Sequence, residues 1–200
     1  ISTVIGIPLG FYSAIKQGTI FDPLVVSFTL VIYAMPVFLT APLLIIIFAL
    51  NLGWVPVSGW GGFWDLRVIL PAITVGLPGI AVITRLMRAS TLDVLGQEFI
   101  TFAKAKGVSY RDVVIKHVGK NAIIPVITVL GLSFSGMLGG ALIVELIFGI
   151  PGVARFALDA IFSRDYPIIM ALTLIGTASL VVANLIVDLL YVLLDPRIRY

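Results

Sequence analysis

Long apolar runs separated by short polar connections dominate the hydrophobic pattern of this chain. The runs extend over residues 1–15, 24–50, 68–87, 123–148 and 168–194. A helix needs about 20 consecutive apolar residues to cross a bilayer core, and the runs lack the alternation that is typical of barrel strands. The pattern therefore predicts an all-α polytopic membrane protein with five visible helices. The first run begins at Ile1, without an initiating Met, and we expect the chain to be N-terminally truncated.

The composition agrees with a membrane protein and closes several chemical possibilities. Hydrophobic residues make up 60% of the 200 residues and charged residues 12%, with a mean hydropathy of +1.17, which is too apolar for an ordinary soluble domain. The chain has no cysteine and a single histidine, His117. A disulfide framework, a thiolate metal site and a centre built from several imidazoles are therefore excluded within this chain, and no metal site is expected.

Basic residues are distributed unequally between the connections. Only Arg67, Arg155 and Arg164 belong to the connections 51–67 and 149–167. The alternate connections and the tail contain or adjoin the other ten of the 13 basic residues: Lys16, Arg85, Arg88, Lys104, Lys106, Arg111, Lys116, Lys120, Arg197 and Arg199. The positive-inside rule then predicts that residues 16–23, the loop 88–122 and the C-terminus are cytoplasmic. The net charge of +3 is explained by this topology, and no nucleic-acid partner is expected.

Three residues within the apolar runs are candidates for a transport pathway or gate. Pro36 lies inside the second run, where proline kinks a helix or leaves carbonyls unpaired, and Pro42, Pro71 and Pro78 are expected to act similarly. Glu145 and Asp188 are carboxylates inside or near membrane spans, where an ionised group is costly and is often functional. Pairing with a neighbouring helix or subunit is the alternative for both carboxylates.

The loop 88–122 is long and patterned. Leu95, Phe99, Phe102 and Ala103 recur at helical spacing, and Gly107 can end that helix as a C-cap. Ser109 can begin a second helix as an N-cap. The pattern predicts a helix, a glycine turn and a helix at the membrane surface. Such a basic amphipathic hairpin could simply rest on anionic lipid.

Several short stretches carry a resemblance to a known family. They are Phe102-Ala-Lys-Ala-Lys-Gly107, Lys116-His117, Asn121-Ala122 followed by Pro125, Gly6-Ile-Pro-Leu-Gly10 with Asp22, Glu145-Leu-Ile-Phe-Gly-Ile-Pro-Gly152, Asp165-Tyr-Pro167 and Leu194-Asp-Pro-Arg197. Together they resemble ABC importer permeases, most closely the dipeptide, oligopeptide and nickel branch of the binding-protein-dependent inner-membrane components. The resemblance implies a type I importer transmembrane domain over residues 1–200, with one more helix before Ile1, in the inner membrane of a prokaryote.

The resemblance also implies a role for the loop. It would be the coupling loop that docks on a separate P-loop ATPase subunit, and the implied coupling residues are Phe102, Ala103, Lys104, Ala105, Lys106, Gly107, His117 and Asn121. Thr101 and Phe102 depart from the wider signature, which has Glu and Ala there, so a mechanism that needs a carboxylate at position 101 is not expected. Gly119 and Lys120 depart from an aliphatic residue and proline.

The implied function is import of di- or oligopeptides, with nickel or a nickel chelate as the alternative cargo. The implied partners are two ATPase subunits that hold ATP and Mg, a second and paralogous permease, an extracytoplasmic solute-binding protein and membrane lipid. The chain has no P-loop, catalytic triad or paired-carboxylate motif, so no catalytic residue and no bound cofactor are predicted. An ion-coupled transporter and a membrane scaffold with a surface-bound hairpin remain as alternatives from other classes.

Overall fold

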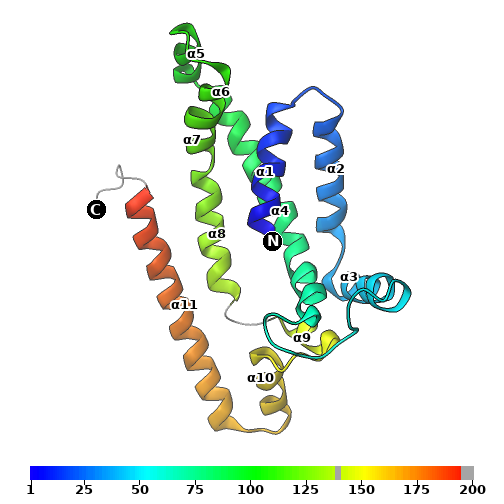
Figure 1. Cartoon of the computed structure of the whole chain (residues 1–200). Helices are drawn as coiled ribbons and strands as arrows, with labels where there is room; N and C mark the ends of the chain where they lie inside the picture. Colours follow the sequence, from blue (N-terminus) through cyan, green and yellow to red (C-terminus); the bar gives the residue numbers. More distant parts are fainter. Residues whose placement is uncertain (138–140, 195–200) are drawn as a thin grey trace. The chain divides into compact units, whose positions relative to one another are not determined.

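In the computed structural model the described residues, 1–137 and 141–194, are helices and short connections (Figure 1). Contacts between residues divide the chain into two compact units. Unit 1 consists of residues Ile1–Ala34 and Gly76–Leu130, and unit 2 contains Met35–Val75 and the part that begins at Gly131. Two long helices, α4 and α8, cross from one unit to the other.

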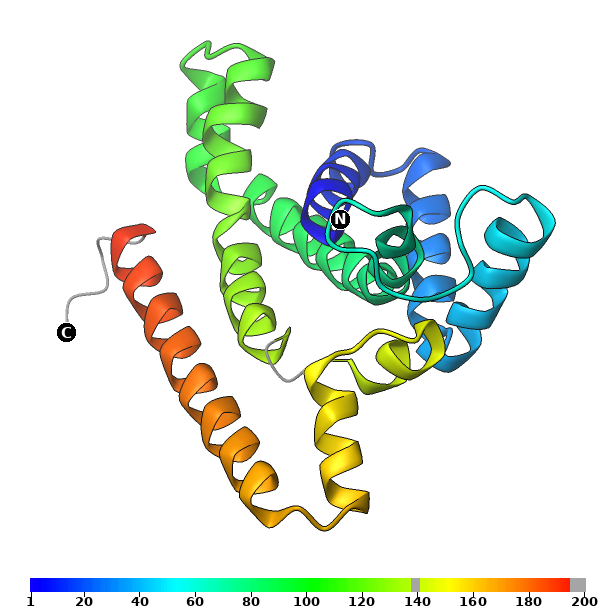
Figure 2. The same ribbon diagram turned by 60° about the horizontal axis from the view of Figure 1, so that its bottom comes forward.

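Unit 1 begins with two antiparallel helices, α1 (Ser2–Ile15) and α2 (Phe21–Ala34), which lie side by side in Figures 1 and 2. They are followed by most of α4 (Ile69–Leu95), α5 (Glu98–Ala105), α6 (Tyr110–Asp112), a π-helical turn (Val113–Gly119), α7 (Lys120–Ala122) and the first half of α8 (Ile124–Met137). The core of this unit contains Ile83 and Met87 of α4, Ile100 of α5, and Val118 and Val126.

Helices α1 and α4 approach closely at two glycines of α1. A Cβ atom on Gly6 would lie 2.9 Å from Ile83 Cβ, and one on Gly10 would lie 2.9 Å from Met87 Cβ. Glycines four residues apart let two membrane helices bring their backbones together, because little else than close packing favours contact between apolar helices in lipid. The stretch Gly6–Gly10 therefore fixes how α1 lies on α4.

Unit 2 contains several short helices, the 29-residue helix α11 (Tyr166–Leu194) and a second core. The short helical segments are α3 (Val37–Leu44), a π-helical segment (Ile45–Asn51), a 3-10 turn (Leu66–Val68), α9 (Leu142–Phe148) and α10 (Val153–Phe162). Its core is formed by Ala41, Leu70, Val144 and Phe148. The backbone carbonyl of Phe148 accepts a 2.7 Å hydrogen bond from the Gly59 N–H, which ties the loop 52–65 to the end of α9.

The helices agree with the predicted membrane protein in class and differ in detail. Among the described residues, three helices are long and apolar enough to span a bilayer: Leu66–Leu95, Tyr110–Gly131 and Tyr166–Ile186. Helices α2 and Val37–Asn51 together form a bent fourth candidate, and α1 is a shorter apolar helix. These five segments correspond to four of the predicted runs and to part of the remaining one, 123–148.

Two predicted spans need correction. The run 24–50 is not one straight helix. It bends by 101° at Met35 and Pro36, which confirms the predicted kink, since Pro36 has no N–H to continue the hydrogen-bond ladder of α2. The run 123–148 is also divided, because Ala141 has a φ of −123°, which is not helical, and α9 begins after it.

The remaining prolines behave differently from Pro36. Helix α4 continues through Pro78 without ending, and Pro71 lies in its first turn, where a backbone N–H has no partner to lose. Pro42 is inside α3. The connection 149–167 also holds a helix that the sequence pattern did not predict, α10, which is amphipathic and too short for an 18-residue window.

Candidate functional site

The predicted hairpin is present, and a glycine turn ends its first helix as predicted. Gly107 has a φ of +79°, and no atom lies within 4 Å of the place where a Cβ would stand. The Gly107 N–H donates to the Lys104 carbonyl at 3.0 Å, and the Val108 N–H donates to the Ala103 carbonyl at 3.3 Å. These two bonds make a Schellman motif, the usual way to satisfy the last carbonyls of a helix with a left-handed glycine.

The second helix begins at Ser109, also as predicted. The Ser109 Oγ accepts a hydrogen bond from the Asp112 N–H at 3.2 Å and donates one to Asp112 Oδ2 at 2.8 Å. Asp112 is in turn 2.6 Å from Lys116 Nζ, one helical turn later. These contacts fix the direction in which the chain leaves the turn.

The second helix of the hairpin continues into a long apolar helix, and a two-residue break separates the first helix from α4. Helix α4 runs on to Leu95, so the first hairpin helix starts at Glu98, after a two-residue break, rather than at Leu95. On the other side, one helix continues from Tyr110 to Gly131. Figure 1 shows α5 beyond the ends of α4 and α8 in this part of the chain. The hairpin is thus the joint between two membrane helices.

The inner face of the hairpin is a small apolar core. Ile100 of α5 and Val113 and Val118 of the π-helical turn are completely buried, and Ala103 is 9% exposed among them. The predicted coupling residue Ala103 therefore lies inside the hairpin, where a larger side chain would separate the two helices. Its contribution to any docking surface is through the shape of the hairpin.

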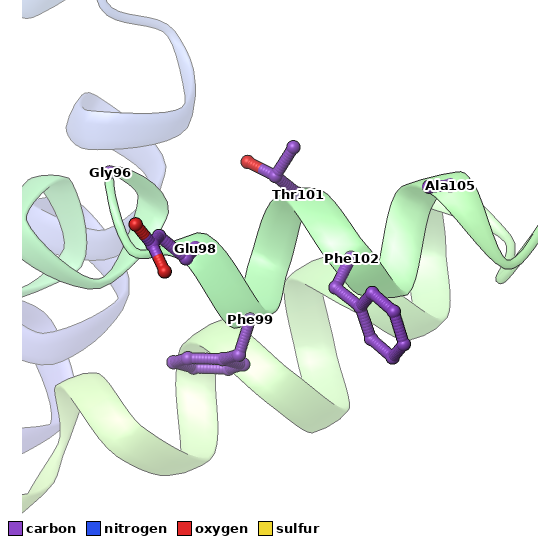
Figure 3. Close-up of a pocket in the computed structure, with 6 residues that line it drawn as sticks. All are labelled: Gly96, Glu98, Phe99, Thr101, Phe102 and Ala105. Atoms are coloured by element: carbon purple, nitrogen blue, oxygen red, sulfur yellow. The ribbon is translucent and has the colours of Figure 1, made fainter.

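The outer face of α5 carries an exposed apolar groove. Phe102 is 61% exposed and Phe99 40%. In Figure 3 both rings project from one side of the helix, in a groove that Gly96, Glu98, Thr101 and Ala105 complete. The Lys106 ammonium lies 4.6 Å from the centroid of the Phe102 ring, and Lys104 is exposed. Aromatic side chains are enriched at protein interfaces, so the exposed rings are well suited to contact a protein surface.

The other predicted hairpin residues lie on the second helix. His117 is half-buried, and its backbone carbonyl accepts a 2.6 Å hydrogen bond from the Asn121 side chain. The amide of Asn121 is thereby used within its own helix. Within the described parts of the chain, no three His, Asp or Glu side chains gather as metal ligands.

Glu145, a predicted pathway residue, binds backbone groups of unit 2. It is 8% exposed. Its Oε2 accepts a 2.7 Å hydrogen bond from the Arg155 N–H, in the first turn of α10, and its Oε1 is 3.4 Å from the Ala141 N–H. The carboxylate therefore caps α10 from the preceding helix, where the positive end of the helix dipole favours a negative charge.

The other two pathway candidates are Pro36, which the structure describes, and Asp188, whose side chain it does not describe. Pro36 is exposed and precedes α3 as its N-cap, with a ψ of 143°, at the break after α2. Asp188 belongs to α11, but its side chain lies outside the described residues. Its proposed role stays a prediction.

Comparison with known proteins identifies the family. The model of the binding-protein-dependent transport system inner membrane component matches residues 6–200. The chain belongs to this family. It is 38% identical over 199 residues to the oligopeptide transport system permease protein OppB of Haemophilus influenzae, matching 100% of this chain and 65% of that protein. It is 38% identical over 228 residues to the dipeptide transport system permease protein DppB of Escherichia coli, strain K12, matching 100% and 67%.

A solved structure confirms the fold of this permease. An amino acid ABC transporter crystallised with histidines matches with a TM-score of 0.68 at 17% identity, over 95% of this chain and 86% of that one. The predictions of a permease of this family, of an inner-membrane protein and of an all-α transmembrane domain are thus confirmed. As a permease component, the chain is a non-catalytic transmembrane subunit. It spans about 65% of the length of OppB.

The permease also contains a buried ion pair that was not among the predicted site residues. Arg88 of α4 donates to Asp22 at the start of α2 through Nε, at 2.6 Å, and through Nη2, at 2.7 Å. The Ser13 hydroxyl of α1 donates to the same carboxylate at 2.6 Å. Ser13 is completely buried and Asp22 is 6% exposed. Three helices of unit 1 meet at this carboxylate.

The signal that could have found this pair is the cost of a charge in a membrane helix. The same rule singled out Glu145 and Asp188. The rule was not applied to Asp22 and Arg88, because the predicted apolar runs began at residue 24 and ended at residue 87 and so excluded both charged residues. The structure places both charges within helices, α2 and α4.

Proposed function

We propose that this chain is the permease subunit of an ATP-driven importer of di- or oligopeptides, and that the hairpin 96–122 is its docking element for an ATPase subunit. The observation that carries the docking role is the exposed groove of Phe99 and Phe102 on a short helix that packs in one core with two long apolar helices. A short packed helix can transmit the rigid-body movement of a bound partner to the helices that continue from it.

The cargo is proposed from the relatives. OppB and DppB are named as oligopeptide and dipeptide permeases, which favours peptides over nickel. The family description implies an extracytoplasmic binding protein as a further partner. In this proposal the hairpin faces the cytoplasm, the side that the distribution of Lys and Arg favours, and a second, paralogous permease completes the pathway.

Site-specific crosslinking tests the docking role. The 200-residue sequence contains no cysteine, so an introduced cysteine is the single thiol in this sequence that the probe can label. A cysteine at Ala105, which is exposed on the groove, is crosslinked in native membranes with a thiol-reactive photoprobe. We expect capture of a P-loop ATPase subunit. The matched control is a cysteine at Ser163, which is also exposed but lies in the connection 149–167, on the opposite side of the membrane in this proposal, and it should capture little. Capture of lipid alone from position 105, or equal capture from both positions, would contradict the docking role.

Uptake of labelled dialanine and trialanine tests the cargo. The complete transporter, with its binding protein and ATPase subunits, is reconstituted in vesicles with ATP on the ATPase side. ATP-dependent accumulation of either peptide supports the proposal. Accumulation of nickel without accumulation of either peptide would replace the peptide by the metal as cargo and leave the docking role standing.

A further inference from the structure

Helix α2 is attached to the rest of unit 1 differently from its neighbours. The hydrophobic core of this unit contains described residues of α1, α4, α5 and the helix 110–131, such as Phe11, Met87, Ile100 and Val118, but none of α2. In a bilayer, apolar packing distinguishes poorly between a neighbouring helix and lipid, so small residues and polar contacts hold helices together. Two kinds of contact therefore hold α2: its packing on α1, where the Phe21 ring centroid lies 5.0 Å from that of Tyr12, and its polar contacts with α4.

The first of these polar contacts is at the beginning of α2. Asp22 receives both donors of the Arg88 guanidinium, at 2.6 and 2.7 Å, and the Ser13 hydroxyl at 2.6 Å. A bidentate pair of this kind fixes orientation as well as distance. Pulling α2 away from α4 at this point would leave a nearly buried carboxylate without its counter-charge, which is among the costliest changes in a protein interior.

The second contact is near the end of α2 and uses another arginine of α4. The Arg85 guanidinium carbon lies 4.6 Å from the centroid of the Tyr33 ring. Tyr33 follows Asp22 by 11 residues, which places it on the same face of the helix about 16 Å further along. Arg85 is one turn from Arg88. Within the described parts of the chain no carboxylate lies within ion-pair distance of Arg85, so the ring of Tyr33 is its contact on α2.

The middle of α2 adds no hydrogen bond between the two helices. Thr29 lies between Asp22 and Tyr33 and is completely buried, but its hydroxyl donates to the Val26 carbonyl of its own helix. Two arginines of α4, one turn apart, thus hold α2 near both of its ends. We refer to Asp22, Tyr33, Arg85 and Arg88 as the arginine clamp.

The clamp lies on the helix that leads to the docking hairpin. Helix α4 continues without a break from Arg85 and Arg88 to Leu95, and α5 begins only three residues later. The hairpin and α4 also share one core, through Val94, Ile100 and Val113. A displacement of the hairpin is therefore carried by α4 to both arginines. At its other end α2 is followed by the break at Met35 and Pro36.

We propose that the arginine clamp makes α2 move together with α4, and that it thereby couples ATP hydrolysis to opening of the pathway. Asp22 and Arg88 are positioning residues in this mechanism, because they act by holding α2 rather than by touching the cargo. This inference rests on the proposed function as an ATP-driven importer. Loss of the clamp should let the hairpin and α4 move while α2 lags, so that ATP is consumed without transport.

The test measures the number of ATP molecules hydrolysed per dialanine imported by the complete reconstituted transporter. In Asp22→Asn this ratio should rise at least about fivefold, the lower end of common coupling effects, while ATP hydrolysis is retained. The exchanged pair Asp22→Arg with Arg88→Asp should recover part of the loss. The matched control is Asp65→Asn, which removes the solvent-exposed pair of Asp65 and Arg67 and should leave the ratio unchanged.

Tyr33 provides a second test that does not threaten folding, since its side chain is 54% exposed. Tyr33→Leu removes the ring under Arg85 and should raise the ratio, whereas Tyr33→Phe keeps the ring and should not. An unchanged ratio in both Asp22→Asn and Tyr33→Leu would overturn the clamp. So would a parallel loss of hydrolysis and import in both, because that result indicates a purely structural role. A wild-type transporter that shows no ATP-dependent import of peptide or nickel would overturn the proposed function as an importer, and the inference with it.

Discussion

Gly152→Ala should destabilise unit 2 through the carboxylate of Glu145. The backbone φ of Gly152 is −96°, which alanine adopts freely, so no backbone strain is introduced. An added Cβ would instead overlap the Glu145 carboxyl group. The carboxylate would have to turn away from the Arg155 N–H, which it now binds at 2.7 Å, while it stays almost buried at 8% exposure. Gly152→Ala thus isolates one contact.

The size of the effect follows from that contact. A hydrogen bond to a charged group contributes about 1.5–3 kcal/mol, and the 3.4 Å contact with the Ala141 N–H adds little. The reduced freedom of the unfolded chain offsets the loss by about 0.5 kcal/mol. A net loss of about 2 kcal/mol remains, which corresponds to a decrease of about 4–8 °C in Tm for a chain of this length.

Thermal unfolding of the purified transporter in detergent checks this value. Gly176→Ala is the matched control, because nothing lies within 4 Å of its Cβ position within α11, and it should leave the Tm unchanged or raise it slightly. The double variant with Glu145→Ala is decisive. Removing the carboxylate removes the overlap, so Gly152→Ala should cost nearly nothing in that background. The same decrease in both backgrounds would refute the reasoning.

Two further substitutions test the hairpin and the interior of α4. Gly107→Asp should abolish peptide import while the protein inserts normally. Aspartate adopts the left-handed conformation of this turn at a cost of only about 1 kcal/mol, but its side chain adds a negative charge to the proposed docking surface. Gly107→Asn is the uncharged control for uptake, and an equal loss would show that the turn, not the charge, is responsible. Thr84→Val should leave the Tm unchanged or raise it, because the buried Thr84 hydroxyl has no hydrogen-bond partner among the described residues. Thr91→Val, which removes a 2.6 Å bond to the Met87 carbonyl, should lower the Tm.

The helices were predictable from the sequence where composition decides them, and unpredictable where it does not. Apolar length suffices for α11 and for the membrane part of α4. It does not distinguish a single span from two helices around a break, because residues on both sides of Pro36 are equally apolar. Apolar length also fails to predict α10, because this ten-residue helix is short and has one apolar and one polar face.

The hairpin shows the same division between local and distant causes. The turn was predictable because Gly107 and Ser109 act on residues within one turn of themselves. The continuation of α4 to Leu95 was not, because Arg88 seemed to mark the end of the membrane helix. That charge is balanced by Asp22, which is 66 residues away in the sequence. No local pattern reveals such a partner.

The two buried carboxylates also show how the rule for charges in membrane helices can be refined. Glu145 binds backbone N–H groups within one compact unit, so its contacts need not change when helices move, and its role is to fix the start of α10. Asp22 binds side chains of two other helices, α1 and α4. If one of these helices moves relative to α2, either the contacts of Asp22 break or α2 moves with that helix. A buried carboxylate that binds side chains of other helices, as Asp22 does, is therefore a better candidate for coupling movement to transport than one that binds backbone groups, as Glu145 does. The bonding partner of the carboxylate, and not its charge alone, distinguishes these two roles.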